Sequence, residues 1–297
     1  DQILITLGAQ NALWMTAQIL LTQRRVAAME NPAYPGLREI LSQTRCRTVA
    51  IDVGPEGLPP GRLPPDTDVV FATVSHHCPT NVTMPLERRK ELLRLAEARG
   101  FVIVEDEYEF ELSFQAAPSP SLKSMDQGGC VIHIGSFSKS LFPGLRLGYV
   151  VASEEFIREA RGLRGLVLRH PPGHIQRTVA YFLSLGHYDA QINRMRQAYQ
   201  RRRAVMDQAI AAEGLSIAEN AGQGGSSFWM IAPPGIDTED LARRLDRRGV
   251  VIEPGRGFFG PDHGPSRHYR LAYSSIHEDR IPEGIRRIAE EIRASPA

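Results

Sequence analysis

Apolar and polar positions along the first half of the chain follow two different periods. Short apolar runs typical of buried strands occur at 25–31, 47–52, 68–74 and 101–106. Between them, apolar positions recur at helical spacing near 8–22, 34–45 and 84–100. In the last of these segments Pro85 lies in the first turn and Gly100 follows the end, as helix boundaries prefer. Because strands and helices alternate, we expect an α/β fold with a mainly parallel, mixed sheet covered by helices.

The second half of the chain has another pattern. From about residue 153 it becomes helical and includes a long arginine-rich stretch at 192–214. Strand-like runs then follow at 215–220, 227–232, 250–255 and 268–274, before a final helix. We therefore predict a large domain at 1–170, connecting helices at 171–212 and a smaller C-terminal α/β domain at 213–297.

The composition excludes several classes of protein. With 35 basic and 34 acidic residues the formal net charge is +1, which creates no strong field toward nucleic acid or an anionic membrane. No apolar run approaches the roughly 18 residues of a membrane span, and we expect no secretory leader. The three cysteines have unrelated spacings, which argues against a disulfide framework and suits a reducing compartment. A cytoplasmic protein without a membrane partner is expected.

Two conspicuous features have plain interpretations. The arginine run from Arg194 to Arg203 contains Tyr199 as its only aromatic residue, which favours a solvated helix face or a spine between domains over nucleic-acid binding. The neighbouring His76 and His77 have no carboxylate or cysteine at ligand spacing. Ordinary hydrogen-bonding histidines are therefore favoured over a metal site, and no metal is expected.

Lysine is rare in this chain, which makes Lys139 conspicuous. Only Lys90 and Lys123 accompany it among 35 lysines and arginines, so arginine carries most of the positive surface charge. A lysine amine can lose its proton and attack a carbonyl carbon, whereas a guanidinium stays charged. Lys139, in the stretch "GSFSKSLFPGLRLGY", is therefore a candidate for forming a Schiff base.

Strand geometry selects two further polar residues. In "FVIVEDEYEFEL", Asp106 and Tyr108 fall on one face of the strand, and Glu105 and Glu107 fall on the other. Ligands of α/β sheets bind at the carboxyl ends of the strands. An acid and a phenol at such an edge could hold a ring N–H⁺ and a ring oxygen, although a polar strand end in solvent would read the same way.

A third group of residues suits an anion. In "TLGAQNAL" a glycine turn leads into a helix, where free backbone N–H groups and the helix dipole favour a phosphate. The lysine stretch adds Ser136, Ser138 and Arg146, whose guanidinium can bind a phosphate through two N–H groups. Together these groups describe a cofactor with an aldehyde, a ring nitrogen, a ring oxygen and a phosphate. Pyridoxal 5'-phosphate (PLP) has all four.

The ordered motifs also resemble a known family. The set "LGAQNAL", "ENPAYPG", "HHCPTNVTMPLERR", "VEDEYEFE", "GSFSKSLFPGLRLGY" and "HYRLAYS" looks like a fold-type-I aminotransferase domain. More narrowly, it resembles the PLP-binding effector domain of MocR-type transcription regulators, which belong to the GntR family. The resemblance covers nearly the whole chain, and the lysine motif followed by "FPGLRLGY" is its most specific part.

The resemblance implies a role for each candidate residue. Lys139 would form the internal aldimine, Asp106 would face the pyridine nitrogen and Tyr108 the ring oxygen. Arg270, in "HYRLAY", would bind the carboxylate of an effector or substrate. The other implied cofactor contacts are Ser136, Ser138, Arg146 and the backbone of Ala9 and Gln10 at the phosphate, and Tyr34 stacked on the ring.

Two departures from the aminotransferase pattern bear on function. Most aminotransferases place an asparagine before the proline of an "NPTG" motif, whereas this chain reads "CPTN" with Cys78 at that place in the cofactor site. The regulator domains also tend to lack this asparagine. An enzyme of the class would carry a longer N-terminal portion, so we expect a fragment of a longer protein.

Two functions fit these observations. The first is a sensor domain of a bacterial regulator, which forms an external aldimine with an amino acid or amino sulfonate and acts on DNA only through an upstream domain absent from this chain. The alternative is a working aminotransferase that acts on an amino acid. Both need the lysine, the phosphate anchor and the partner of the ring nitrogen, and they differ in proton transfer and turnover. In either case a homodimer is expected.

Overall fold

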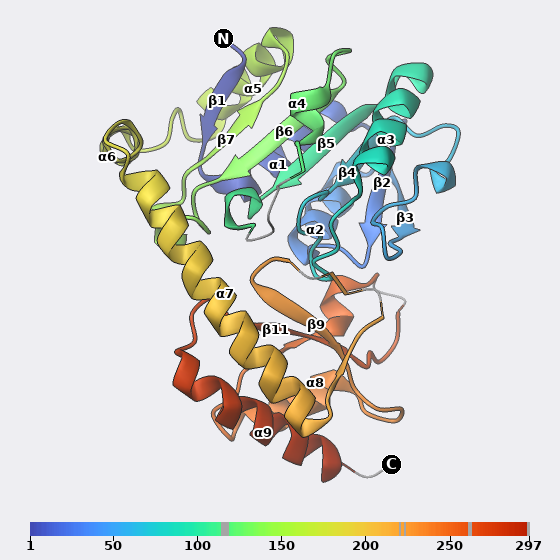
Figure 1. The fold of residues 1–297 in the computed structure, drawn as a ribbon. Coiled ribbons are helices and arrows are strands. Elements are labelled where there is room, and N and C mark those ends of the chain that lie inside the picture. Colours follow the sequence, from blue (N-terminus) through green and yellow to red (C-terminus); the bar gives the residue numbers. More distant parts are fainter. Residues whose placement is uncertain (114–118, 220, 223, 261–262, 296–297) are drawn as a thin grey trace.

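Two sheets and a long helix that joins them organise the chain (Figure 1). The computed structural model describes residues 1–113, 119–219, 221–222, 224–260 and 263–295. The larger sheet lies nearer the N-terminus and the smaller one nearer the C-terminus (Figure 1).

The larger sheet has seven strands. In spatial order they are β1 (Ile3–Thr6), β7 (Gly148–Val151), β6 (Val131–Ser136), β5 (Val102–Glu107), β4 (Val69–Ala72), β2 (Val26–Asn31) and β3 (Arg47–Asp52). The pairs from β6 to β3 are parallel, while β7 runs antiparallel to both β6 and β1. This arrangement confirms the mainly parallel, mixed sheet that the sequence predicts.

Helices cover both faces of the larger sheet. One face packs against α1 (Gly8–Leu20), α2 (Pro35–Thr44) and α5 (Glu154–Val167). The other face packs against α3 (Leu86–Arg99) and the short α4 (Leu122–Met125). Because both faces are covered, all four residues of β4 are buried, which explains the continuous apolar run in the sequence.

The smaller sheet is antiparallel throughout. Its spatial order is β10 (Glu253–Pro254), β11 (His268–Ala272), β9 (Ser227–Ile231) and β8 (Ser216–Ile217). Helices α8 (Thr238–Asp246) and α9 (Ile281–Arg293) share its apolar core with α7 (His187–Glu213). The outer strands β8 and β10 are shorter than the predicted runs at 215–220 and 250–255, of which Asn220 lies outside the described residues.

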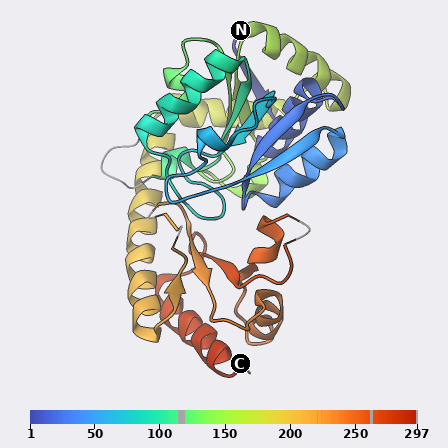
Figure 2. The ribbon, with the colours of Figure 1, turned by 90° about the vertical axis from the view of Figure 1, so that its right-hand side faces the viewer.

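Helix α7 connects the two parts of the molecule. It follows α6 (Gly173–Ser184) and runs from the larger sheet down one side of the smaller one (Figure 2). Arg196 donates through Nε to the Glu111 carbonyl oxygen at 2.8 Å, on the larger side. Arg203 donates to the Gly224 carbonyl oxygen at 3.3 Å and lies over the Phe228 ring, on the smaller side. The arginine run therefore forms a spine between the two parts, one of the two expected interpretations.

One arginine contradicts the expectation that arginines carry surface charge. Arg89, on α3, is completely buried. Its guanidinium donates to three backbone carbonyl oxygens, those of Met84 at 2.9 Å, Val74 at 2.8 Å and Pro120 at 2.8 Å. The side chain therefore ties the loops around the first turn of α3 together, and burial lowers its pKa.

None of the helices in the described residues is both long and apolar enough to cross a bilayer.

Candidate cofactor site

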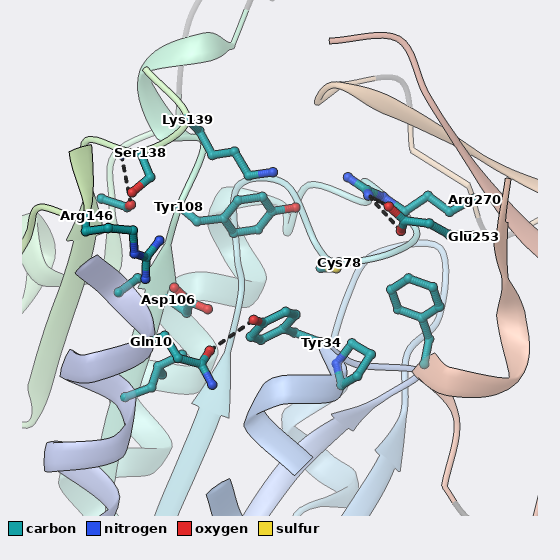
Figure 3. Close-up of a pocket in the computed structure, with 15 residues that line it drawn as sticks. Gln10, Tyr34, Cys78, Asp106, Tyr108, Ser138, Lys139, Arg146, Glu253 and Arg270 are labelled. Carbon is teal, nitrogen blue, oxygen red and sulfur yellow. Dashed lines mark hydrogen bonds and ion pairs between the residues drawn. The ribbon is translucent and has the colours of Figure 1, made fainter. Parts of the chain in front are cut away.

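A cavity of about 400 Å³ opens where the carboxyl ends of the larger sheet's strands meet the smaller sheet. That volume lies within the usual range for small-molecule sites. Every residue predicted for the cofactor or effector site lines it: Ala9, Gln10, Tyr34, Cys78, Asp106, Tyr108, Ser136, Ser138, Lys139, Arg146 and Arg270. Residues as far apart in the sequence as Ala9 and Arg270 are thus brought to one place (Figure 3), while the role of each side chain stays a prediction.

One end of the cavity carries groups that suit an anion. Helix α1 begins at Gly8, whose φ of +80° suits glycine, and the preceding Leu7 makes no side-chain cap to the first N–H groups. The guanidinium of Arg146 lies close to this helix start. A Cβ added to Gly8 would lie 3.0 Å from Nη2 of Arg146. A guanidinium and free N–H groups therefore face the same space, which favours a phosphate.

The serines next to Arg146 extend this anion site. The backbone N–H of Ser138 donates to Oγ of Ser136 at 3.2 Å, which orients the Ser136 side chain. Oγ of Ser138 is buried and has no hydrogen-bond partner among the described residues. Because an unpaired buried hydroxyl is costly, this atom fits a phosphate oxygen placed in the cavity.

Asp106 marks the floor of the cavity at the end of β5. It is 9% exposed, and its Oδ1 has no hydrogen-bond partner in the described part of the chain. Burial raises its pKa to about 7, and His133 nearby only partly opposes this rise. A cation set against this carboxylate, such as a protonated ring nitrogen, would satisfy it.

The neighbouring carboxylate on β5 has a structural role instead. Glu105 points to the opposite face and accepts hydrogen bonds from the Leu122 N–H at 2.5 Å and the Lys123 N–H at 3.2 Å. It also pairs with Nδ1 of His133 at 2.8 Å. Glu105 and Asp106 therefore differ in their partners: the Glu105 carboxylate is hydrogen-bonded, whereas Oδ1 of Asp106 is not within the described residues.

Three polar side chains surround the centre of the cavity. Tyr34 precedes α2, is 41% exposed and donates from its hydroxyl to Oε1 of Gln10 at 3.0 Å. Tyr108 lies across the centre of the cavity, and burial raises its pKa (Figure 3). Burial also raises the pKa of the Cys78 thiol to about 12, so the thiol stays protonated at neutral pH.

Lys139 differs from the other two lysines in its partners. Lys90 pairs with Glu87 at 2.7 Å, and Lys123 pairs with Asp126 at 2.9 Å. No carboxylate of the described residues pairs with Lys139, whose amine extends into the cavity beside Tyr108 (Figure 3). An amine without a fixed counter-ion is free to react with a carbonyl group.

Arg270 closes the far side of the cavity from β11. Its side chain is 10% exposed and donates from Nε to Oγ of Ser227 at 3.0 Å. Nη1 donates to both carboxylate oxygens of Glu253, at 3.1 and 3.0 Å. Burial alone would lower the pKa of Arg270, but the acidic groups around it, Glu253 among them, raise it. The guanidinium is therefore charged and already holds one carboxylate.

Four residues of the cavity wall were not predicted: Leu13, Pro35, Glu253 and Phe258. In the sequence, nothing distinguishes the apolar residues of this group from residues of the hydrophobic core. Glu253 follows the apolar residues 250–252 within "VVIEPG", and only the pairing of β10 with β11 brings it opposite Arg270.

The two neighbouring histidines differ from each other. His77 hydrogen-bonds through Nδ1 to Oγ1 of Thr80 at 2.7 Å, as expected, and burial lowers its pKa to about 3. His76 is also buried, but neither of its ring nitrogens has a partner among the described residues. The expectation of a hydrogen-bonded histidine is wrong for His76 as far as the described residues go, because none of them gives its ring a hydrogen bond. The described part of the chain contains no cluster of metal-ligating side chains.

Comparison with known proteins assigns the chain to a family. The family described as aminotransferase class I and II matches residues 1–288. The protein belongs to this family, as its motifs, fold and cavity indicate.

Individual relatives include both regulators and enzymes. The HTH-type transcriptional regulator TauR of Rhodobacter capsulatus is 59% identical over 99% of this chain and 60% of its own length. The probable rhizopine catabolism regulatory protein MocR of Rhizobium meliloti is 29% identical over 96% of the chain and 58% of its own length. The structure of LysN, an alpha-aminoadipate aminotransferase from Thermus thermophilus complexed with N-(5'-phosphopyridoxyl)-L-leucine, superposes with a TM-score of 0.90 at 29% identity, over 98% of this chain and 77% of LysN. The chain thus spans about three fifths of the length of the regulators it matches.

Proposed function

We propose that this protein is the PLP-binding, effector-sensing part of a bacterial transcription regulator. The cavity supports the proposal, because Lys139 and Arg270 face the same space from opposite sides (Figure 3). A small molecule with an amine at one end and an acidic group at the other could meet both. Amino acids and amino sulfonates have this chemistry.

The residues present fit the cofactor. Arg146, the start of α1 and the unpaired hydroxyl of Ser138 would hold the phosphate. The unpaired carboxylate of Asp106 would hold the protonated ring nitrogen. When bound, PLP supplies an aldehyde that condenses reversibly with amines.

Other side chains would orient the cofactor and the ligand. Tyr108 would hydrogen-bond the ring oxygen, while Cys78, a weak donor, would contact the same side of the ring. Tyr34 would stack on the ring. Lys139 would hold the cofactor until a ligand amine displaces it, and Arg270 would bind the ligand's acidic group.

Similarity to regulators supports the sensing role. The 59% identity with the R. capsulatus regulator extends over nearly the whole chain. We infer that the full-length protein binds DNA through a segment upstream of the present residues, acts in the cytoplasm and forms a homodimer. Sequencing the coding region upstream tests the first point, since it should encode a basic helix-turn-helix domain.

An aminotransferase is the second candidate. The likeness to LysN over 98% of the chain favours it, and both functions use the same cavity. The two differ in whether Lys139 also moves a proton from the ligand, a step that needs a closed and precisely oriented site.

The cofactor proposal is tested by substituting each lysine in turn. We expect the purified protein to absorb visible light, as PLP does when its aldehyde is bound to a lysine. Lys139→Ala should lose this absorption, because no other lysine lines the cavity. Lys90→Ala and Lys123→Ala are matched controls, since both residues pair with carboxylates elsewhere and should leave the band intact. Loss of the band in either control would refute the assignment.

A second experiment separates the sensor from the enzyme. The protein is mixed with an amino acid or amino sulfonate, and the released cofactor is identified by chromatography after several hours. A sensor should change its absorption spectrum within minutes and release unchanged PLP. Steady accumulation of pyridoxamine phosphate and keto acid would establish the aminotransferase instead.

A further inference from the structure

The acid-binding side of the cavity already contains an acid. Glu253 on β10 and Arg270 on β11 are directly opposite each other in the antiparallel register. Both line the cavity, and Nη1 of Arg270 donates to both carboxylate oxygens of Glu253 (Figure 3). The Glu253 carboxylate therefore already accepts hydrogen bonds from the guanidinium that would bind a ligand's acidic group.

The two partners differ in their freedom to move. The Arg270 side chain is 10% exposed and is also held by Ser227, whereas the Glu253 side chain is 51% exposed. Glu253 is the first residue of the two-residue strand β10, before Pro254, and its half-exposed carboxylate can turn toward water and be solvated there. Arg270 cannot, because its guanidinium is enclosed by the cavity wall. When an acid enters, Glu253 is the partner free to leave.

We propose that Glu253 is a built-in competitor that the acidic group of the ligand must displace from Arg270. This inference rests on the proposed function. The carboxylate would neutralise the buried guanidinium while no ligand is bound, and its negative charge would oppose the entry of a second acid. Glu253 would thereby weaken the binding of acidic amines relative to amines without an acidic group.

A purely structural role is the competing explanation. Opposite charges on neighbouring strands stabilise pairing and fix register, and Glu253 could do no more than that. Under that explanation Glu253→Gln would loosen β10 and displace Arg270, so that acids bind more weakly. The competitor proposal predicts the opposite direction for the same variant, because glutamine keeps the shape but loses the charge.

The experiment measures ligand affinity by calorimetry and by visible absorption, on protein saturated with PLP. The probes are taurine and β-alanine, which carry an amine and an acid, and propylamine, which lacks the acid. For Glu253→Gln we expect the Kd of both acidic probes to fall about threefold to tenfold, a moderate effect because the carboxylate is half exposed and screened. The Kd of propylamine should not fall. Glu239→Gln is the matched control, since Glu239 is similarly exposed and pairs with Arg256 away from the cavity wall.

The remaining outcomes of this experiment bear on the competitor role of Glu253 or on the proposed function. Unchanged or weaker binding of taurine and β-alanine to Glu253→Gln, or equal tightening for propylamine, would overturn the competitor role. Arg270→Gln separates this failure from failure of the proposed function. If wild-type protein binds the acidic probes and Arg270→Gln binds them more weakly, the sensor proposal stands whatever Glu253 does. If wild-type protein binds none of the three amines, the proposed function fails and the competitor role fails with it.

Discussion

Single residues define this site because some of their buried polar atoms have no hydrogen-bond partner among the described residues. Asp106 and Glu105 are neighbours on β5 and both are carboxylates, yet only Glu105 has donors around it. The difference follows from the pleat, which turns one side chain toward α4 and the other into the cavity. A buried carboxylate oxygen without a donor is unstable on its own, so the cavity floor is suited to receive a cation.

The burial of Asp106 predicts a pH-dependent stability of the cofactor-free protein. Its pKa is raised from 3.8 to about 7, so the folded state binds the proton more tightly than the unfolded chain does. The stability present below about pH 4 is therefore lost as the pH rises toward 7. Between pH 5 and 8 the free energy of unfolding of the wild-type protein should fall by about 2 to 3 kcal/mol more than that of Asp106→Asn. Urea denaturation at the two pH values measures this difference.

The control for this prediction is an exposed aspartate. Asp246→Asn, at the end of α8, should follow the wild-type pH dependence, because its side chain faces solvent. Saturating PLP should abolish the advantage of Asp106→Asn, since the wild-type carboxylate would then have a cationic partner. Equal pH profiles for Asp106→Asn and wild-type protein without cofactor would contradict the proposed environment of this carboxylate.

At the level of elements, the anion site depends on three segments meeting closely. Strand β7 passes so near to β6 and to the start of α1 that Gly148 has no room for a side chain. A Cβ there would lie 2.8 Å from the Gly135 carbonyl oxygen and 3.0 Å from the Ala9 nitrogen. Backbone atoms cannot move aside as side chains do. The approach of β7 therefore sets the position of the helix start beneath Arg146.

Gly148→Ala should damage both stability and cofactor binding. Forcing backbone segments apart costs about 1 to 3 kcal/mol, and the shift would move the first N–H groups of α1 away from the phosphate. We expect a lower urea midpoint and a higher Kd for PLP. Gly54→Ala is the matched control, because a Cβ at Gly54 meets no atom within 4 Å. Wild-type PLP affinity in Gly148→Ala would show that this contact does not position the anion site.

Some residues of the fold and the site can be predicted from a local sequence pattern, and others cannot. Alternation within one strand placed Asp106 and Tyr108 at the cavity without any knowledge of neighbouring strands. Glu253 could not be found in this way, because its importance arises from pairing with a strand 17 residues further along. Arg89 shows the same limit, since its burial depends on three carbonyl groups from two separate loops, one before α3 and one before α4. Local period is visible in a sequence, whereas contacts between distant segments are not.

At the scale of the whole molecule, apolar side chains remain exposed beside the anion site. Leu166 and Val167 end α5 with exposed fractions of 87% and 51%, and Leu183 on α6 is 42% exposed. Val167 also lines a second cavity that shares Gln10 and Arg146 with the first. Exposed apolar groups concentrated on two helices are typical of a protein interface. We therefore expect the proposed homodimer to form through α5 and α6, next to the phosphate end of the site.

Leu183→Asp tests this interface. Leu183 lines an apolar groove with Val179, Ile5 and Phe137, so an aspartate there would put an unpaired charge between the subunits. Such burial costs several kcal/mol. Because each 1.4 kcal/mol corresponds to a factor of ten, the dissociation constant of the dimer should rise at least about tenfold. Sedimentation velocity over a range of protein concentrations measures it.

Val251→Asp provides the matched control for that experiment. Val251 is 80% exposed but lies beside β10 in the smaller part of the molecule, away from α5 and α6. The added charge should leave dimerisation unchanged there. If Leu183→Asp and Val251→Asp sediment alike as dimers, the interface lies elsewhere. If only Leu183→Asp is monomeric and it also retains less PLP, then the second subunit supports the phosphate end of the cavity, as the shared lining of the two cavities suggests.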